Sequence, residues 1–305
     1  MEYSGYLFVH FTGESETGEQ IYFSLSRDGL HWTDLNGGEP VIWSKAGEKG
    51  VRDPFILRNK IDGKFYIIST DLRIANGKGW EAAQLHGSRN IMVCSSHDLV
   101  NWTAVEPVEI GIDGAGCVWA PEAIYDESKR EYMVFWASMV KRQGDENPKQ
   151  RIYKAFTKDF KIYTKPQLYI ERENHIIDTT IIEYKGIYYR FSKDETTKNI
   201  IADMSKNVSE GPFEKLNAPE VEKLMGVEGP ACFKFNDREE WCLMVDRFAE
   251  GKGYMPIITK DISSGRFKLL EGSMYDMGKT KKRHGSVLNI TGEEYEALEK
   301  SFGIN

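Results

Sequence analysis

Short runs of apolar, β-branched and aromatic residues dominate the chain, and turn signals such as Asp28-Gly29 separate them at short intervals. Only residues 292–301 have the pattern of an amphipathic helix, with Thr291 placed to cap it. The pattern therefore predicts an all-β protein. The predicted strands are residues 6–11, 20–26, 65–70, 90–95, 132–137, 187–192 and 241–245.

One motif recurs after the strands: Ser or Thr, any residue, then Asp, with an aromatic residue a few positions later. The clear copies read S-R-D-G-L-H-W, S-H-D-L-V-N-W and T-K-D-F-K-I-Y, and two degenerate copies follow them. An Asp side chain in such a turn accepts hydrogen bonds from backbone N–H groups, while the aromatic residue packs the outer strand. We interpret the five copies as five sheets of similar build. Their third positions are residues 28, 98, 159, 207 and 261, with spacings of 70, 61, 48 and 54.

A second series consists of polar residues at strand starts, with spacings of 69, 56, 50 and 56. Its members are Asp53, Glu122, Asp178, Glu228 and His284. In a β-propeller the innermost strand of each blade runs along a central channel, so equivalent strand starts converge. The sequence therefore predicts a five-bladed β-propeller with an acidic pocket at one mouth. We expect a single catalytic domain over residues 1–305, closed by pairing of the N- and C-terminal strands.

Composition excludes several other classes of protein. With 40 Lys and Arg against 47 Asp and Glu, the net charge of −7 argues against nucleic-acid partners and a basic membrane-binding surface. No apolar run approaches the length of about 18 residues that a spanning helix needs. The four Cys contain no C-x-x-C pair. The N-terminus lacks the pattern of a secretory signal, so we expect a cytoplasmic location, or secretion if a signal has been removed.

Clustered carboxyl groups suit two kinds of chemistry. In glycoside hydrolysis, a protonated carboxyl gives its proton to the leaving oxygen, and an ionised one activates water or attacks the sugar. A metal site is the other common use of clustered acids. The predicted acids lie on separate blades without short ligand spacing, so the sequence gives no strong metal signal.

The chain resembles glycoside hydrolase family 43, five-bladed propeller enzymes that act on arabinose- and xylose-containing polysaccharides. The motifs R-D-P-F-I, W-A-P-E, I-D-T-T, V-E-G-P and H-G-S-V follow the family's order over nearly the whole chain. The resemblance implies that Asp53 is the general base and Glu228 the general acid, while Asp178 raises the pKa of the acid and orients it. In an inverting enzyme of this type, the carboxyls of Asp53 and Glu228 lie roughly 6.5–9.5 Å apart. Glu122 and Thr179 replace the family's usual Asp and Pro, which affects the expected shape of the subsites.

Several further side chains are candidates for substrate contacts, and packing or solvated surface is the alternative interpretation for each. The substrate-binding candidates are Trp119, Glu122, Arg247 and His284, followed by Arg283, Trp43, Trp80 and Phe11. His284 either lines the pocket or faces a water or an ion, because similar enzymes often hold calcium in the central channel. Apart from that possible Ca²⁺ ion, we expect no metal site and no required cofactor.

The resemblance implies an inverting, exo-acting glycoside hydrolase. Its expected activity is release of terminal α-L-arabinofuranose, β-D-xylose or both from small hemicellulose-derived oligosaccharides, such as arabinoxylan or arabinan fragments. Two alternatives stay open: an endo-α-1,5-L-arabinanase with an open groove, and a non-catalytic sugar-binding propeller. A fructan-acting relative is disfavoured because no strand resembles N-D-P-N-G.

Overall fold

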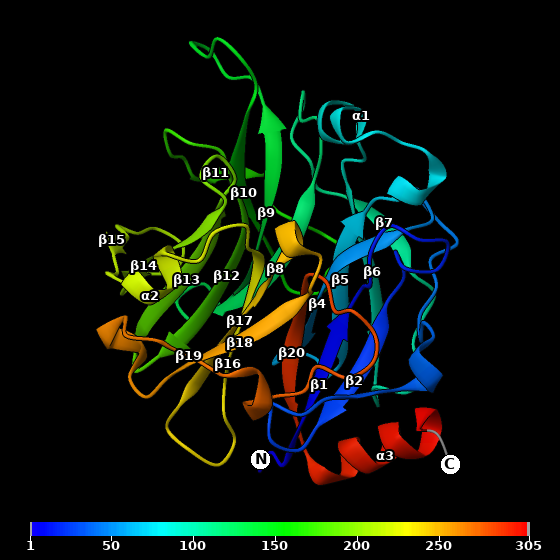
Figure 1. Ribbon diagram of the computed structural model, residues 1–305. Coiled ribbons are helices and arrows are strands. Elements are labelled where there is room, and N and C mark those ends of the chain that lie inside the picture. Colours follow the sequence, from blue (N-terminus) through cyan, green and yellow to red (C-terminus); the bar gives the residue numbers. More distant parts are fainter. Residues whose placement is uncertain (1, 304–305) are drawn as a thin grey trace.

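Five four-stranded antiparallel sheets stand around one axis as the blades of a propeller (Figure 1). The computed structural model describes residues 2–303. The all-β, five-bladed fold predicted from the two residue series is therefore confirmed. Figure 1 also shows that α1 and α3 lie at opposite ends of the propeller.

Each blade is named by its strands, from the innermost to the outermost. Blade 1 contains β4 (Val51–Arg58), β5 (Phe65–Asp71), β6 (Asn90–Ser96) and β7 (Glu106–Glu109). Blade 2 contains β8 (Trp119–Asp126), β9 (Glu131–Val140), β10 (Lys149–Thr157) and β11 (Gln167–Ile170). Blade 3 contains β12 (Ile176–Tyr184), β13 (Ile187–Asp194), β14 (Asn199–Ser205) and β15 (Glu214–Lys215). Blade 4 contains β16 (Glu228–Lys234), β17 (Trp241–Asp246), β18 (Tyr254–Thr259) and β19 (Lys268–Leu269), and blade 5 contains β20 (Gly285–Ile290), β1 (Gly5–His10), β2 (Tyr22–Ser26) and β3 (Thr33–Asp34).

Blade 5 closes the ring as predicted, because β20 pairs with β1 along its whole length. The two strands lie side by side in Figure 1, red against blue. The predicted terminal helix is α3 (Gly292–Phe302), and Thr291 and Glu294 form a capping box at its start. Two short helices were not predicted: α1 (Trp80–Leu85) and α2 (Pro219–Glu222). Among the described residues, no helix has the length and hydropathy needed to span a membrane.

The recurring Asp motif forms the turn between the third and outermost strands of each blade. In blade 5, Asp28 Oδ1 accepts hydrogen bonds from the backbone N–H groups of Leu30 and His31, both at 2.8 Å. Asp98 and Asp159 make the same bonds in blades 1 and 2. In blade 3 the amide oxygen of Asn207 accepts two such bonds, and in blade 4 Asp261 accepts one, from Ser263. The turn role inferred from the sequence is therefore confirmed for all five copies.

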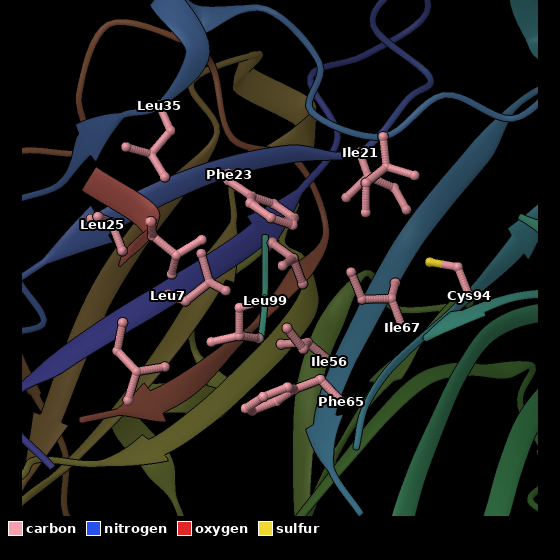
Figure 2. Close-up of a cluster of buried hydrophobic side chains, with 14 of the residues drawn as sticks. Leu7, Ile21, Phe23, Leu25, Leu35, Ile56, Phe65, Ile67, Cys94 and Leu99 are labelled. Atoms are coloured by element: carbon pink, nitrogen blue, oxygen red, sulfur yellow. The ribbon is translucent and has the colours of Figure 1, made fainter. Parts of the chain in front are cut away.

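A hydrophobic cluster fills each of the five seams between neighbouring blades. Figure 2 shows the cluster between blades 5 and 1, to which both blades contribute side chains. They include Leu7, Phe23 and Leu25 from blade 5 and Ile56, Phe65 and Ile67 from blade 1. Burial of each such side chain stabilises the fold by about 1.5–3 kcal/mol, so the seams hold the blades in fixed relative positions.

The innermost strands of blades 1 to 4 each contain a β-bulge near the same mouth of the channel. At each bulge one residue has a left-handed φ: 50° at Asp53, 47° at Ala120, 48° at Asp178 and 53° at Gly229. This conformation is strained for residues other than glycine and bends the strand locally. The five polar residues of the second series are therefore not all equivalent. Ala120 and Gly229 occupy the bulge positions in blades 2 and 4, not the acids predicted there.

Candidate active site

A pocket of about 530 Å³ opens where the innermost strands begin. Of the residues proposed from the sequence, Asp53, Asp178, Glu228, His284, Trp119, Trp80 and Arg283 line this pocket. The other lining residues are Arg52, Leu72, Glu81, Gln84, Ile177, Lys193, Glu195 and Phe248. Side chains far apart in the sequence thus converge at one mouth, as the strand-start series predicts.

Asp53 is held by hydrogen bonds and charges on both sides of its carboxyl group. Oδ2 accepts a hydrogen bond from Thr70 Oγ1 at 2.7 Å, and Oδ1 lies 3.4 Å from His284 Nδ1. Burial alone would raise the pKa of Asp53. The hydrogen bond and charge of His284, with the charge of Arg52, outweigh burial and lower this pKa below its ordinary value. Asp53 is therefore ionised at neutral and mildly acidic pH.

Asp178 has the opposite tendency. Its Oδ2 accepts a hydrogen bond from the backbone N–H of Gly229 at 3.1 Å, and Oδ1 lies 3.8 Å from His284 Nδ1. Burial raises the pKa of Asp178 to about 6, although the positive charges of His284 and Lys193 oppose this shift. Asp53 and Asp178 thus differ in their affinity for a proton, although both are buried beside His284.

Glu228 accepts hydrogen bonds from two cations, the buried Lys193 and the partly buried Arg283. Lys193 Nζ donates to Oε2 at 2.7 Å, and Arg283 Nη2 donates to Oε1 at 2.8 Å. Burial raises the pKa of Glu228, but these two ion pairs outweigh it and lower the pKa below its ordinary value. Lys193 also forms an ion pair with Glu195, and Arg283 forms one with Asp246, so alternating positive and negative groups surround the carboxylate of Glu228. Glu228 is therefore ionised in the substrate-free protein at neutral pH.

Glu122 does not line the pocket, although the sequence placed it with the other acids. It lies three residues beyond Trp119 along β8, away from the mouth, and it is buried. Burial raises the pKa of Glu122 to about 8, although the charge of His284 opposes the shift. Glu122 is thus a neutral carboxylic acid at pH 7, placed below the pocket in the central channel.

Two tryptophans form one wall of the pocket. Trp80 on α1 is 50% exposed, and its ring lies edge-on to that of Trp119 with centroids 6.2 Å apart. The guanidinium group of Arg52 lies 5.0 Å from the Trp80 ring and 4.4 Å from the buried Phe11 ring, beneath the pocket. This wall offers an apolar, aromatic face of the kind on which sugar rings stack.

Two other candidates lie elsewhere. Arg247 is outside the lining of the pocket, and its Nε donates instead to the carbonyl oxygen of Gly253 at 3.2 Å. Trp43 is exposed and is also outside the lining.

Sequence reasoning missed Arg52, Thr70 and Lys193, which act on the predicted acids, as well as Glu81, Gln84 and Glu195 in the lining of the pocket. Arg52, Thr70 and Lys193 lie in β4, β5 and β13 respectively. The signal that marks them is a buried polar side chain on the innermost strand or its neighbour, close to the mouth. Arg52 also binds the fully buried Glu19, whose carboxylate accepts N–H groups of Ile74 and Ala75 in the loop before α1.

Because His284 and Glu122 in the channel hold protons at neutral pH, we expect the protein to lose stability as pH rises above 6.5. Burial lowers the pKa of His284, but the charges of Asp178 and Asp53 dominate and raise it to about 9, while that of Glu122 is about 8. Both groups therefore hold protons in the folded state that the unfolded chain releases at neutral pH. The contribution of Glu122 is full below pH 4.5 and decreases up to about pH 8, and that of His284 is full below pH 6.5 and decreases up to about pH 9, so stability falls over the range from 6.5 to 9.

We expect the melting temperature to fall steadily between pH 6.5 and 9, as measured by thermal unfolding monitored by circular dichroism. The variant Glu122→Gln keeps the shape of the neutral side chain but has no proton to lose, so its melting temperature should fall less steeply. A melting temperature that is constant or rises over this range would contradict the proposed protonation of the channel.

Comparison with known proteins identifies the family. Residues 1–296 match the model of a probable glycosyl hydrolase domain related to family 43. A curated α-L-arabinofuranosidase of Bifidobacterium longum subsp. longum is 30% identical over 291 residues, covering 81% of this chain and 27% of that protein. The chain thus spans about a quarter of the length of this relative.

Two solved structures share the fold at low sequence identity. A thermostable family-43 glycoside hydrolase superposes with a TM-score of 0.61 at 13% identity, covering 92% of this chain and 93% of the other. An α-L-arabinanase mutant from Cellvibrio cellulosa superposes with a TM-score of 0.60 at 14% identity, covering 92% and 96%. The family model matches nearly the whole chain, and the shared fold and the convergent carboxyl groups agree with it. The chain belongs to the glycosyl hydrolase domains related to glycoside hydrolase family 43.

Proposed function

We propose that this glycoside hydrolase is an inverting, exo-acting enzyme that releases terminal α-L-arabinofuranose, β-D-xylose or both from short oligosaccharides. The observation that supports the proposal most is the convergence of Asp53, Asp178 and Glu228 in one pocket. The arabinofuranosidase named among the relatives supports the choice of a pentose. The volume of about 530 Å³ falls within the usual range for small-ligand sites.

In this proposal Asp53 is the general base. Its low pKa keeps it ionised over the range in which a carboxylic acid nearby can hold a proton. Asp53 removes a proton from water as the water attacks the anomeric carbon from the face opposite the leaving group. In this proposal Asp178 positions Glu228, because its carboxylate accepts a hydrogen bond from the backbone N–H of Gly229, the residue after Glu228.

Glu228 is the proposed general acid, which donates a proton to the glycosidic oxygen. The ion pairs with Lys193 and Arg283 oppose protonation of Glu228 in the free enzyme. The fraction of enzyme with Asp53 ionised and Glu228 protonated therefore grows as pH falls below 7. We accordingly propose a mildly acidic optimum for kcat/KM, which reports on the free enzyme.

We propose that the reaction needs no metal ion. Calcium takes about six to eight oxygen ligands. Within residues 2–303, no three His, Cys, Asp or Glu side chains are arranged to hold an ion. His284 Nδ1 faces the carboxyl groups of Asp53 and Asp178, so an imidazolium ion supplies positive charge at this point of the channel. In this proposal the imidazolium supplies the positive charge itself, and no step of the mechanism passes through a metal ion.

A panel of nitrophenyl glycosides tests the proposed substrate class. We expect hydrolysis of the α-L-arabinofuranoside or β-D-xyloside and much slower hydrolysis of hexosides such as the β-D-galactoside. Product lengths from linear arabinan distinguish the exo-acting enzyme, which releases monomers, from an endo-arabinanase, which releases mixed oligomers. Sugar binding without hydrolysis of any glycoside would support a non-catalytic propeller and refute the proposal.

A further inference from the structure

The second strand of a blade carries a buried polar residue at one recurring position near the pocket. On the innermost strand of each such blade, one bulge residue has a left-handed φ. The recurring position is the cross-strand partner of the residue just before that bulge residue. The pairs are Thr70 with Arg52, Lys193 with Ile177, and Asp246 with Glu228. Thr70, Lys193 and Asp246 are all buried, with relative exposures of 0%, 2% and 0%. In blade 2 the same position is Ala137.

Each of these three side chains reaches across a seam to the next blade. Thr70 Oγ1 accepts the backbone N–H of Ala120 in blade 2 at 2.8 Å. Lys193 donates to Glu228 in blade 4 at 2.7 Å. Asp246 accepts a hydrogen bond from Nε of Arg283, two residues before the start of β20 in blade 5, at 2.5 Å. These contacts link pocket residues to neighbouring blades as well as to their own sheet.

Thr70 is the member whose hydroxyl group both accepts and donates, and its two partners fix which it does toward each. Because the Ala120 N–H group can only donate, it occupies a lone pair of Thr70 Oγ1. The single hydroxyl proton is then free to point at Asp53 Oδ2, 2.7 Å away. Asp53 has a φ of 50° and Ala120 a φ of 47°, so both ends of this bridge belong to bulges. The bridge thus connects the bulges of blades 1 and 2 through one hydroxyl group.

We propose that Thr70 is a positioning residue for Asp53 in glycoside hydrolysis. This inference rests on the proposed role of Asp53 as general base. The hydroxyl group holds one carboxylate oxygen, and His284 lies beside the other, so the carboxylate keeps one orientation toward the attacking water. A hydrogen bond to the ionised form also favours that form, which the base needs before it can accept a proton.

Kinetics of Thr70→Val across pH tests the proposal on the nitrophenyl pentoside that the wild type hydrolyses best. Valine keeps the shape and removes the hydroxyl. We expect kcat/KM to fall by about 10- to 100-fold, the size of losing one hydrogen bond to a charged group. The acid limb of the pH profile should move to higher pH, because loss of the hydrogen bond raises the pKa of Asp53. Thr70→Ser keeps the hydroxyl and should restore both the rate and the acid limb.

Thr259→Val is the matched control, since Thr259 is a buried threonine whose hydroxyl bonds only within an outer turn of blade 4. It should have the wild-type pH profile. If Thr70→Val does not fold, Thr70→Ala provides the same comparison with a smaller side chain. An unchanged acid limb in the variant without the hydroxyl, or failure of Thr70→Ser to restore it, would overturn the inference. The activity of Asp53→Asn distinguishes failure of this inference from failure of the proposed function. If that variant is fully active, Asp53 is not the base and the proposed function itself fails.

Discussion

Replacing Asp53 with Asn is expected to lower kcat/KM by about 10²- to 10⁴-fold, the usual contribution of a general base. The amide cannot accept the proton that water must lose as it attacks the sugar. Because activation of water is needed whatever group departs, the loss should be similar for nitrophenyl glycosides and for oligosaccharides. Initial rates of both substrates, measured with the same enzyme preparation, provide the comparison.

The matched control for this variant is Asp98→Asn, in the outer turn of blade 1, where the carboxylate bonds to the backbone of Val100 and Asn101. It should keep wild-type kinetics while losing some thermal stability. Circular dichroism of Asp53→Asn should match the wild type, because Asn preserves the volume of the side chain. Near-normal rates in folded Asp53→Asn would refute the assignment of the base.

Replacing Glu228 with Gln is expected to cause a loss that depends on the leaving group. An oligosaccharide releases an alkoxide unless it receives a proton, so kcat/KM should fall by about 10²- to 10⁴-fold. A dinitrophenolate leaves readily without a proton, so the loss on dinitrophenyl glycosides should be far smaller. The ratio of the two losses separates the acid from the base, because Asp53→Asn should show no such dependence.

Glu127→Gln serves as the control for Glu228→Gln, because Glu127 is an exposed partner of Lys60 on the outside of the propeller. Its kinetics should be unchanged on both substrates. Equal losses on oligosaccharides and dinitrophenyl glycosides in Glu228→Gln would contradict a proton-donating role. They would instead indicate that Glu228 mainly holds Lys193 and Arg283 in place.

The fold could be predicted from the sequence because its determinants are local and repeated. The Asp turns satisfy backbone N–H groups within four residues, so their signature is visible in short motifs such as Asp28 to His31. The sequence could not show in the same way which residues of the innermost strands occupy equivalent positions in the five blades. A bulge adds one residue to a strand and changes which residues face the channel. For this reason Glu122 lies below the pocket, while Trp119, three residues earlier, lines it.

Lys193 and Thr70 could not be predicted, because each also bonds to a residue of a neighbouring blade. Lys193 and Glu228 are 35 residues apart, and Thr70 and Ala120 are 50 apart. No periodic pattern marks such pairs, and only the packing of the seams brings them together. Trp80 was named from the sequence, but the helix α1 that carries it to the pocket was not predicted, because six residues are too few to show helical periodicity.

The most direct test of the central claim is proton NMR of the first sugar released during hydrolysis, recorded before mutarotation. A base and an acid on opposite faces of the sugar, with water as the nucleophile, produce inversion at the anomeric carbon. A β-D-xyloside should therefore yield α-xylose first, and an α-L-arabinofuranoside should yield the β anomer. First release of the anomer with retained configuration would show that a carboxylate attacks the sugar, and it would contradict the roles proposed for Asp53 and Glu228.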